Sequence, residues 1–144
     1  NGKLIIKKRP DFNYPEKIII DLKDNPDLAQ TIIVTAFGLN IPTKLTGLST
    51  LKVKETDRIE ALRNELTNLG ASCIIHDESI EFFKSNKLNK NYIINTYDDH
   101  RMALAFAPLS VIFPIEIQDP KVVSKSFPEF WNILEKLNFS IDFI

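Results

Sequence analysis

The sequence predicts an α/β protein made of two repeated β-α-β-α-β-β units, over approximately residues 1–83 and 92–144. The first observation is that short runs of β-branched residues alternate with longer segments of helical periodicity. The second is that the order of these segments recurs in the second half of the chain. The third is that the apolar positions of two helices coincide at an offset of 71 residues. The matched pairs are Ile59 with Phe130, Leu62 with Ile133, and Leu66 with Leu137.

Turn residues mark the boundaries of the first elements. The sequence Asn25-Pro26-Asp27 is typical of a helix start, because proline fits the first helical turn and a carboxylate is favourable at the positive end. The apolar segment that follows ends at Gly38, a residue that commonly closes helices. β-Branched runs bounded by Pro, Asn and Asp predict strands on either side. The elements predicted here are strands at 4–6, 18–20 and 43–48 and a helix over 25–37.

A charged segment, Leu51 to Arg58, leads into a second helix. The apolar residues of this helix are spaced by three, four and three positions, the period of one buried stripe, and Gly70 should end it. We expect it to begin near Glu55, with Lys54, Glu55 and Arg58 sharing its first turn. Two strands at 71–75 and 79–83 then form a hairpin-like pair, and a polar loop covers 85–91.

The second unit repeats this order. A start signal at 96–101 precedes an apolar helix, and Ser126 with Pro128 marks the start of the last helix. The predicted elements are strands at 92–94, 115–117 and 139–143 and helices over 102–109 and 126–137.

Composition excludes several classes of protein. With 44% apolar residues, 26% charged residues and a net charge of -1, the chain is an ordinary globular protein with no electrostatic footprint for nucleic acid. No apolar run approaches the roughly 18 residues that span a bilayer, so we expect no membrane partner. The single cysteine, Cys73, cannot form an internal disulfide, and no signal-peptide pattern is present. A cytoplasmic location fits both observations.

Charged residues cluster at the four predicted helix starts. Right-handed crossovers send the amino ends of such helices toward one end of the sheets, so these residues should converge. They are Asp27, then Lys54, Glu55 and Arg58, then Asp99, His100 and Arg101, then Lys125. Cations at positive helix ends favour a bound phosphate or carboxylate, and Asp27 and Glu55 are candidates for proton transfer beside it. Two histidines without ligand spacing indicate no metal site, and no glycine-rich loop indicates a nucleotide cofactor.

Each of these residues also has an ordinary interpretation. A charge run is usually a solvated helix start whose members pair among themselves. Asp27 and Asp99 could only favour helix dipoles, His100 could be a satisfied histidine, and Lys125 could be a solvated turn residue. The recurrence at equivalent repeat positions favours the functional interpretation.

Three motifs resemble the 5-enolpyruvylshikimate-3-phosphate synthase family. They are Leu-Lys-Val-Lys-Glu-Thr-Asp-Arg-Ile at 51–59 with Glu-Leu-x-x-Leu-Gly-Ala at 65–71, Asp-Asp-His-Arg-Met-Ala-Leu-Ala-Phe-Ala at 98–107, and Asp-Pro-x-x-Val-Ser-Lys-Ser-Phe-Pro-x-Phe at 119–130. The resemblance covers essentially the whole chain but only the carboxy-terminal third of the family protein. It implies part of one enolpyruvyl-transferase-type domain, of which a complete copy has three such units.

The resemblance implies a 3-phosphoshikimate 1-carboxyvinyltransferase. Such an enzyme moves the enolpyruvyl group of phosphoenolpyruvate to the 5-hydroxyl of shikimate 3-phosphate and releases phosphate, in aromatic amino acid biosynthesis. Matched by motif, Asp27 resembles the base and Glu55 the proton donor. Substrate contacts are implied at Lys54, Arg58, His100, Arg101 and Lys125, and at Thr50, where many members carry asparagine. Gln30 departs from the family, in which methionine is frequent. No cofactor or metal is implied.

The implied partners are phosphoenolpyruvate, shikimate 3-phosphate and the missing amino-terminal part of the same enzyme. Because the family's site lies between two domains, we expect this chain to be inactive alone. A non-catalytic anion-binding domain that keeps the fold is one alternative. The enolpyruvyl transferase acting on UDP-N-acetylglucosamine is another, although it lacks the Lys-Glu-Thr-Asp-Arg and Asp-His-Arg-Met strings seen here.

Overall fold

A four-stranded mixed sheet forms one wall of the first half of the chain. The computed structural model describes residues 2, 4–7, 9–85 and 87–144. The strands are β1 (Ile18–Asp21), β2 (Thr43–Thr46), β3 (Ser72–His76) and β4 (Ser79–Phe83), in the spatial order β1-β2-β4-β3. β1 and β2 are parallel and the other pairs are antiparallel. The predicted strands at 18–20 and 43–48 and the hairpin are thereby confirmed, with β2 ending two residues early.

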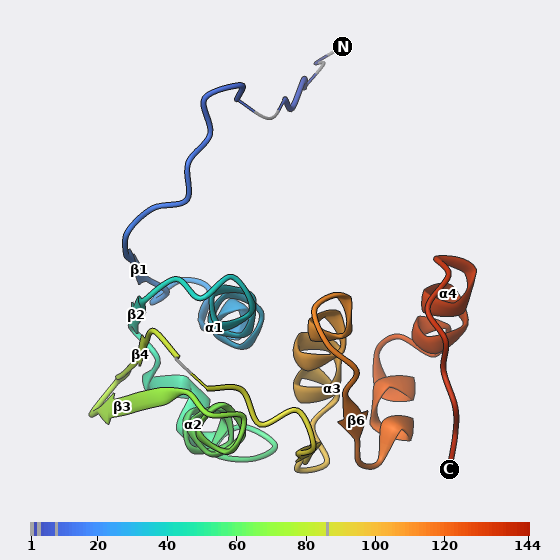
Figure 1. Ribbon diagram of the computed structural model, residues 1–144. Coiled ribbons are helices and arrows are strands. Elements are labelled where there is room, and N and C mark those ends of the chain that lie inside the picture. The colour runs from blue at the N-terminus through green and yellow to red at the C-terminus, as the bar shows by residue number, and fades with distance from the viewer. Residues whose placement is uncertain (1, 3, 8, 86) are drawn as a thin grey trace.

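Two helices cover one face of this sheet (Figure 1). They are α1 (Ala29–Gly38), which follows the short 3-10 helix η1 (Pro26–Leu28), and α2 (Arg58–Asn68), which follows η2 (Ser49–Val53). Side chains on the two faces of the sheet differ in burial. Leu45, Ile80 and Phe82 are fully buried beneath the helices, whereas Ile19 and Ile74 face solvent. This alternation is what a sheet with one covered face requires.

The second half adds a smaller α/β layer. Its elements are β5 (Ile93–Ile94), α3 (His100–Phe106), η3 (Ala107–Val111), β6 (Glu116–Ile117), η4 (Pro120–Lys125) and α4 (Phe130–Lys136). β5 and β6 are parallel, as β1 and β2 are. The predicted helix at 102–109 ends as α-helix at Phe106 and tightens to η3, in whose first turn Pro108 has no amide proton to continue the ladder.

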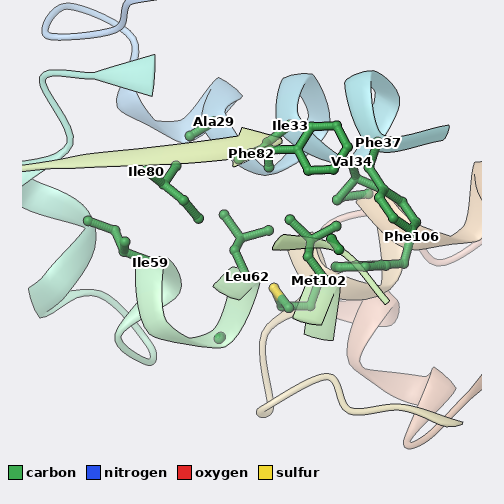
Figure 2. Packing of buried hydrophobic residues seen from close by; sticks show 14 of the residues in the cluster. Ala29, Ile33, Val34, Phe37, Ile59, Leu62, Ile80, Phe82, Met102 and Phe106 are labelled. Carbon is green, nitrogen blue, oxygen red and sulfur yellow. The ribbon is translucent and has the colours of Figure 1, made fainter. Parts of the chain in front are cut away.

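One hydrophobic core joins the two halves. α3 packs on α1 on the side away from the four-stranded sheet, and Met102 and Phe106 belong to the same buried cluster as Ile33, Val34 and Phe37 of α1 (Figure 2). The main core is therefore shared by the two halves, and a smaller cluster around Val122 and Val123 lies in the second half.

Two predicted strands do not form. Residues 4–6 are 84%, 76% and 86% exposed and lie in a segment that runs away from the folded body (Figure 1). Residues 139–143 follow α4 without strand structure. A β-branched run becomes a strand only where a neighbouring strand pairs with it, and among the described residues neither run has one. The first half has the order β-α-β-α-β-β, whereas the described second half has β-α-β-α.

The apolar stripe predicted for the last helix is only partly buried. Phe130 packs against a small cluster with Val122 and Val123, but Ile133 and Leu137 are exposed. The helix also begins at Phe130 rather than near Ser126. In the part of the chain that the structure describes, the stripe is therefore covered at Phe130 and left open at Ile133 and Leu137.

The loop predicted at 85–91 forms no helix or strand at its described residues. Position 86 of this loop and positions 1, 3 and 8 of the first predicted unit lie outside the described residues. Among the described residues no helix is long and apolar enough to cross a membrane.

Candidate anion-binding active site

Asp57, rather than Glu55, sets the start of α2. Its Oδ1 accepts hydrogen bonds from the backbone amides of Ile59 and Glu60, both at 3.1 Å, so it is the N-cap. The helix therefore begins at Arg58, and Lys54 and Glu55 lie in the preceding bend instead of the first turn. The prediction of a helix start near Glu55 was wrong by three residues, because the capping side chain decides the boundary. Gly70, with φ +102°, ends the helix as predicted.

Arg58 is the centre of a buried ion-pair network. Its side chain is only 2% exposed, and its guanidinium contacts three carboxylates from different segments. Nε donates to Oδ2 of Asp99 at 2.6 Å, Nη1 to Oδ1 of Asp27 at 2.9 Å, and Nη2 to Oε2 of Glu55 at 2.7 Å. The fixed fork of the guanidinium suits this geometry, since it has five donors in one plane.

Asp27 gathers two further cations. Arg101 Nη2 lies 3.3 Å from its Oδ2, and Lys54 Nζ lies 3.6 Å from its Oδ1. Arg101 also donates to the backbone oxygen of Asp27 at 3.4 Å. Residues from η1, the bend before α2 and the start of α3 thus meet at one carboxylate, as the argument from right-handed crossovers predicts.

Asp99 is fully buried and caps α3. Its Oδ1 accepts from the backbone amide of Arg101 at 2.9 Å, while Arg58 reaches both of its oxygens. Burial by itself raises the pKa of Asp99, but the hydrogen bond from Arg58, the bond from the Arg101 amide and the charges of Arg58 and His100 outweigh it. The pKa of Asp99 is consequently held below its ordinary value.

This lowered pKa predicts a specific pH dependence of stability. The unfolded state binds a proton at Asp99 before the folded state does, so the stabilisation is present above about pH 4, the ordinary aspartate pKa, and is lost below it. We expect the difference in free energy of unfolding between the wild type and Asp99→Asn to be largest near neutral pH and to shrink on acidification. Urea denaturation from pH 3 to 7 measures it.

Glu81 provides the control for that experiment. Its pKa is also lowered, chiefly by a hydrogen bond from Lys17 at 2.7 Å on the far side of the sheet. The variant Glu81→Gln should therefore remove a separate part of the acid slope, additively with Asp99→Asn. A difference between wild type and Asp99→Asn that stayed constant across this pH range would contradict the assignment.

Lys125 joins the site through Asp98. Its Nζ donates to Oδ1 of Asp98 at 2.9 Å and to the backbone oxygen of Asp98 at 3.1 Å. Lys125 is the last residue of η4, so it does not occupy a helix start as predicted. His100 opens α3 and is half-buried, with Nδ1 3.9 Å from Oδ1 of Asp99.

The site has a buried floor and an open rim. Arg58 and Asp99 form the floor, with side-chain exposures of 2% and 0%. The rim side chains are 36% to 51% exposed and can reach a ligand; they are Lys54, Asp27, Arg101, Glu55 and Lys125. Thr50 is exposed in η2 and takes no part in the described ion pairs of the network.

Sequence reasoning assigned Asp99 only a place at a helix start and did not identify Asp98 as a site residue. The position of Asp99 directly before a helix indicates an N-cap, but nothing in the local sequence indicates its bond to Arg58, 41 positions away. Sequence reasoning also gave Gln30 no place in the site. Gln30 is fully buried and donates from Nε2 to Oδ2 of Asp99 at 3.3 Å. Its Oε1 has no hydrogen-bond partner among the described residues, and neither has the hydroxyl of buried Thr96.

The arrangement fits anion binding better than metal binding. The point where Asp27, Glu55 and Asp99 converge is occupied by the Arg58 guanidinium. Within the described part of the chain no three His, Cys, Asp or Glu side chains are grouped to hold a metal ion. The cations at the rim, by contrast, can exchange carboxylate partners for a phosphate or carboxylate ligand.

Comparison with known proteins identifies the family. The sequence profile of EPSP synthase (3-phosphoshikimate 1-carboxyvinyltransferase) matches residues 3–134. This chain belongs to the EPSP synthase family. Its fold agrees, since an EPSP synthase structure from Acinetobacter baumannii superposes with a TM-score of 0.68 at 26% identity, over 77% of this chain and 27% of that one.

Curated relatives in the EPSP synthase family are much longer than this chain. The 3-phosphoshikimate 1-carboxyvinyltransferase of Bacteroides fragilis strain YCH46 is 49% identical over 141 residues, which is 94% of this chain and 34% of the relative. The enzyme of the same name from Neisseria meningitidis serogroup C is 35% identical over 130 residues, 90% of this chain and 30% of the relative. The chain thus spans about one third of the length of the relatives it matches.

Proposed function

We propose that this chain is the carboxy-terminal third of an EPSP synthase and supplies one wall of its active site. The complete enzyme would transfer the enolpyruvyl group of phosphoenolpyruvate to the 5-hydroxyl of shikimate 3-phosphate and release phosphate. The observation that carries the proposal is the convergence of Arg58, Arg101 and Lys54 on Asp27, with Glu55 beside them. Both substrates are anions, which such a set of cations suits.

The rim residues receive roles that follow from their position. Arg101 and Lys125 would hold phosphoenolpyruvate, with His100 beside them, and Lys54 and Thr50 would contact shikimate 3-phosphate. Asp27 would accept the proton of the 5-hydroxyl, because its carboxylate lies among Arg58, Arg101 and Lys54, the cations that would hold the anionic substrate beside it. Glu55 would donate a proton to the methylene carbon of the enolpyruvyl group.

Arg58 has two roles in this proposal, one structural and one in ligand binding. Its contacts to Asp27 and Asp99 tie η1 and α3 to α2, whereas its third contact, from Nη2 to Glu55, lies toward the rim. Binding of phosphoenolpyruvate by Arg58 would exchange Glu55 for the ligand at Nη2. That exchange would free Glu55 for proton transfer as the anion arrives.

The proposal extends to a missing partner, the rest of the same enzyme. Its support is the exposed apolar surface of this chain: residues 4–6, the Ile133 and Leu137 positions of α4, and Val111 with Ile112 after α3. Surfaces of this kind mark interfaces. We further infer that the second half is a β-α-β-α-β-β repeat whose predicted strand at 139–143 forms only beside that partner, and that the enzyme is cytoplasmic.

We expect the isolated chain to fold but not to catalyse the reaction. One wall of a site cannot exclude water or surround a transition state, so most of the electrostatic stabilisation is lost. The measurement is phosphate release from both substrates, by this chain alone and after mixing with the separately expressed remainder of the enzyme. Activity on mixing only is the expected result. Turnover by the chain alone would contradict the fragment proposal, and no turnover by the complete enzyme would contradict the proposed function.

Two other functions are less well supported. The non-catalytic anion-binding alternative is tested by the same assay, since such a domain would bind phosphoenolpyruvate and never turn it over. The UDP-N-acetylglucosamine alternative has no support from the curated relatives described above, both of which are named 3-phosphoshikimate 1-carboxyvinyltransferase.

A further inference from the structure

A second buried carboxylate lies on the face of α2 that carries Arg58. Glu65 is seven residues, or two helical turns, beyond Arg58, which places the two about 10 Å apart along the helix. Its side chain is fully buried, and in the described part of the chain it makes no ion pair. A buried charge without a cation needs hydrogen bonds to each oxygen to be tolerated.

Three donors from the two sides of β5 satisfy Glu65: Tyr92 precedes this strand, and Asn95 and Tyr97 follow it. Its Oε1 accepts from the hydroxyl of Tyr97 at 2.7 Å and from that of Tyr92 at 3.2 Å, and its Oε2 accepts from the backbone amide of Asn95 at 3.0 Å. The Tyr92 oxygen itself accepts hydrogen bonds from the side-chain amides of Asn68 and Asn95, so the Tyr92 hydroxyl proton is directed at Glu65. The Glu65 side chain is therefore the acceptor in all three bonds.

The loop held by Glu65 leads directly into the anion-binding residues. Tyr97 and Asp98 both have φ near +55°, a left-handed conformation that costs residues other than glycine about 1 kcal/mol or more each. Glu65 holds the loop that follows β5 at Asn95, just before the strained pair, and at Tyr97 within it, and Arg58 holds the loop after the pair, at Asp99. The strained turn is thus fixed from both sides by the same face of α2.

This turn sets where two rim cations lie. The backbone oxygen and carboxylate of Asp98 hold the amine of Lys125, and Asp99 caps the helix turn that carries Arg101. A change of φ at Tyr97 or Asp98 would rotate the Asp98 oxygens away from Lys125. The positions of Arg101 and Lys125 relative to each other consequently depend on the bonds that Glu65 makes.

We propose that Glu65 is a positioning residue for the phosphoenolpyruvate subsite, and that it acts through Tyr97. The inference rests on the proposed function for the identity of the ligand. Glu65 touches no substrate in this scheme. It keeps the strained turn at Tyr97 and Asp98 in the conformation that places Lys125 and Arg101 for one anion.

The variant Tyr97→Phe tests this with the smallest change, because Glu65 keeps its bonds to Tyr92 and Asn95. In the complete enzyme we expect KM for phosphoenolpyruvate to rise by about tenfold, the effect of losing one hydrogen bond to a charged group, with a much smaller change in kcat. KM for shikimate 3-phosphate should change little. A purely structural role would lower the amount of folded enzyme without separating the two KM values.

Glu65→Gln should have the same direction and a larger effect. An amide that presents its oxygen to the Asn95 amide must present its NH2 to the tyrosines, and the Tyr92 proton then has no acceptor. Glu60→Gln is the matched control, since Glu60 lies exposed on the same helix and pairs only with Arg63 in the described structure. It should leave both KM values unchanged.

Hydrogen exchange on the isolated chain supplies a readout that needs no substrate. The amides of Asn95 and Arg101 should lose protection in Tyr97→Phe and Glu65→Gln but keep it in Glu60→Gln. Unchanged protection, or equal rises in the KM of both substrates, would overturn the inference. A wild-type enzyme without turnover would instead refute the proposed function, while the exchange data would still judge whether Glu65 orders the turn.

Discussion

Replacing Arg58 with leucine should lower the free energy of unfolding by about 3 to 5 kcal/mol, the usual cost of removing one partner of a buried ion pair. Asp99 would remain fully buried with its largest source of compensating charge removed, and Asp27 and Glu55 would lose their shared partner. The loss is of the order of the whole stability of many domains of this size. Urea denaturation followed by circular dichroism measures it.

Two variants separate the charge effect from a general effect of losing an arginine. Arg63→Leu is the matched control, because Arg63 lies on the same helix but is 40% exposed and pairs with Glu60 on the surface. Its cost should be within about 1 kcal/mol. The double variant Arg58→Leu with Asp99→Asn should recover part of the loss, since asparagine can still cap α3 without a buried charge. A cost for Arg58→Leu no larger than that for Arg63→Leu would show that the network contributes nothing to stability.

Glu55→Gln should reduce kcat of the complete enzyme by about 10²-fold to 10⁴-fold, the range over which a positioned general acid acts, with KM for both substrates nearly unchanged. Glutamine keeps the size of Glu55 and can still accept the hydrogen bond from Arg58 through its oxygen. It has no transferable proton. Steady-state kinetics with each substrate varied in turn gives both constants.

The interpretation of that result depends on two comparisons. Glu60→Gln, a change of the same type at an exposed position of α2, should retain wild-type kcat. A single-turnover measurement then distinguishes slow chemistry from slow product release. If Glu55→Gln turned over within a few fold of the wild type, Glu55 would have no part in proton transfer, and the role would have to move to another rim residue.

The elements that could be predicted are those whose signals are local. The stripe of Ile59, Leu62 and Leu66 predicted a buried helix, and all three are fully buried. Asn25-Pro26-Asp27 correctly predicted a helical start, because proline and a first-turn carboxylate have the same meaning in any context. The strands predicted at 4–6 and 139–143 were wrong for the opposite reason, since a strand depends on a partner that the run itself does not specify.

The sequence predicted which residues would come together in the candidate site, but not the bonds between them. Right-handed crossovers indicated that Asp27, Lys54 and Arg101 would meet, and they do. The burial of Arg58 beneath them depends on bonds to Asp27 and Asp99, which span 31 and 41 positions. The hydrogen bond from Tyr97 to Glu65, across 32 positions, likewise cannot be predicted from the spacing of residues.

The shared core between α1 and α3 limits how this protein can change by recombination. Although the apolar positions of two helices match at an offset of 71 residues, Met102 and Phe106 of the second half complete the packing around α1 of the first. By itself the second half has only the small cluster of Ala103, Val122 and Val123. Exchanging one half with that of a relative would therefore succeed only if the α1–α3 contact surface and the Arg58–Asp99 bond were inherited together.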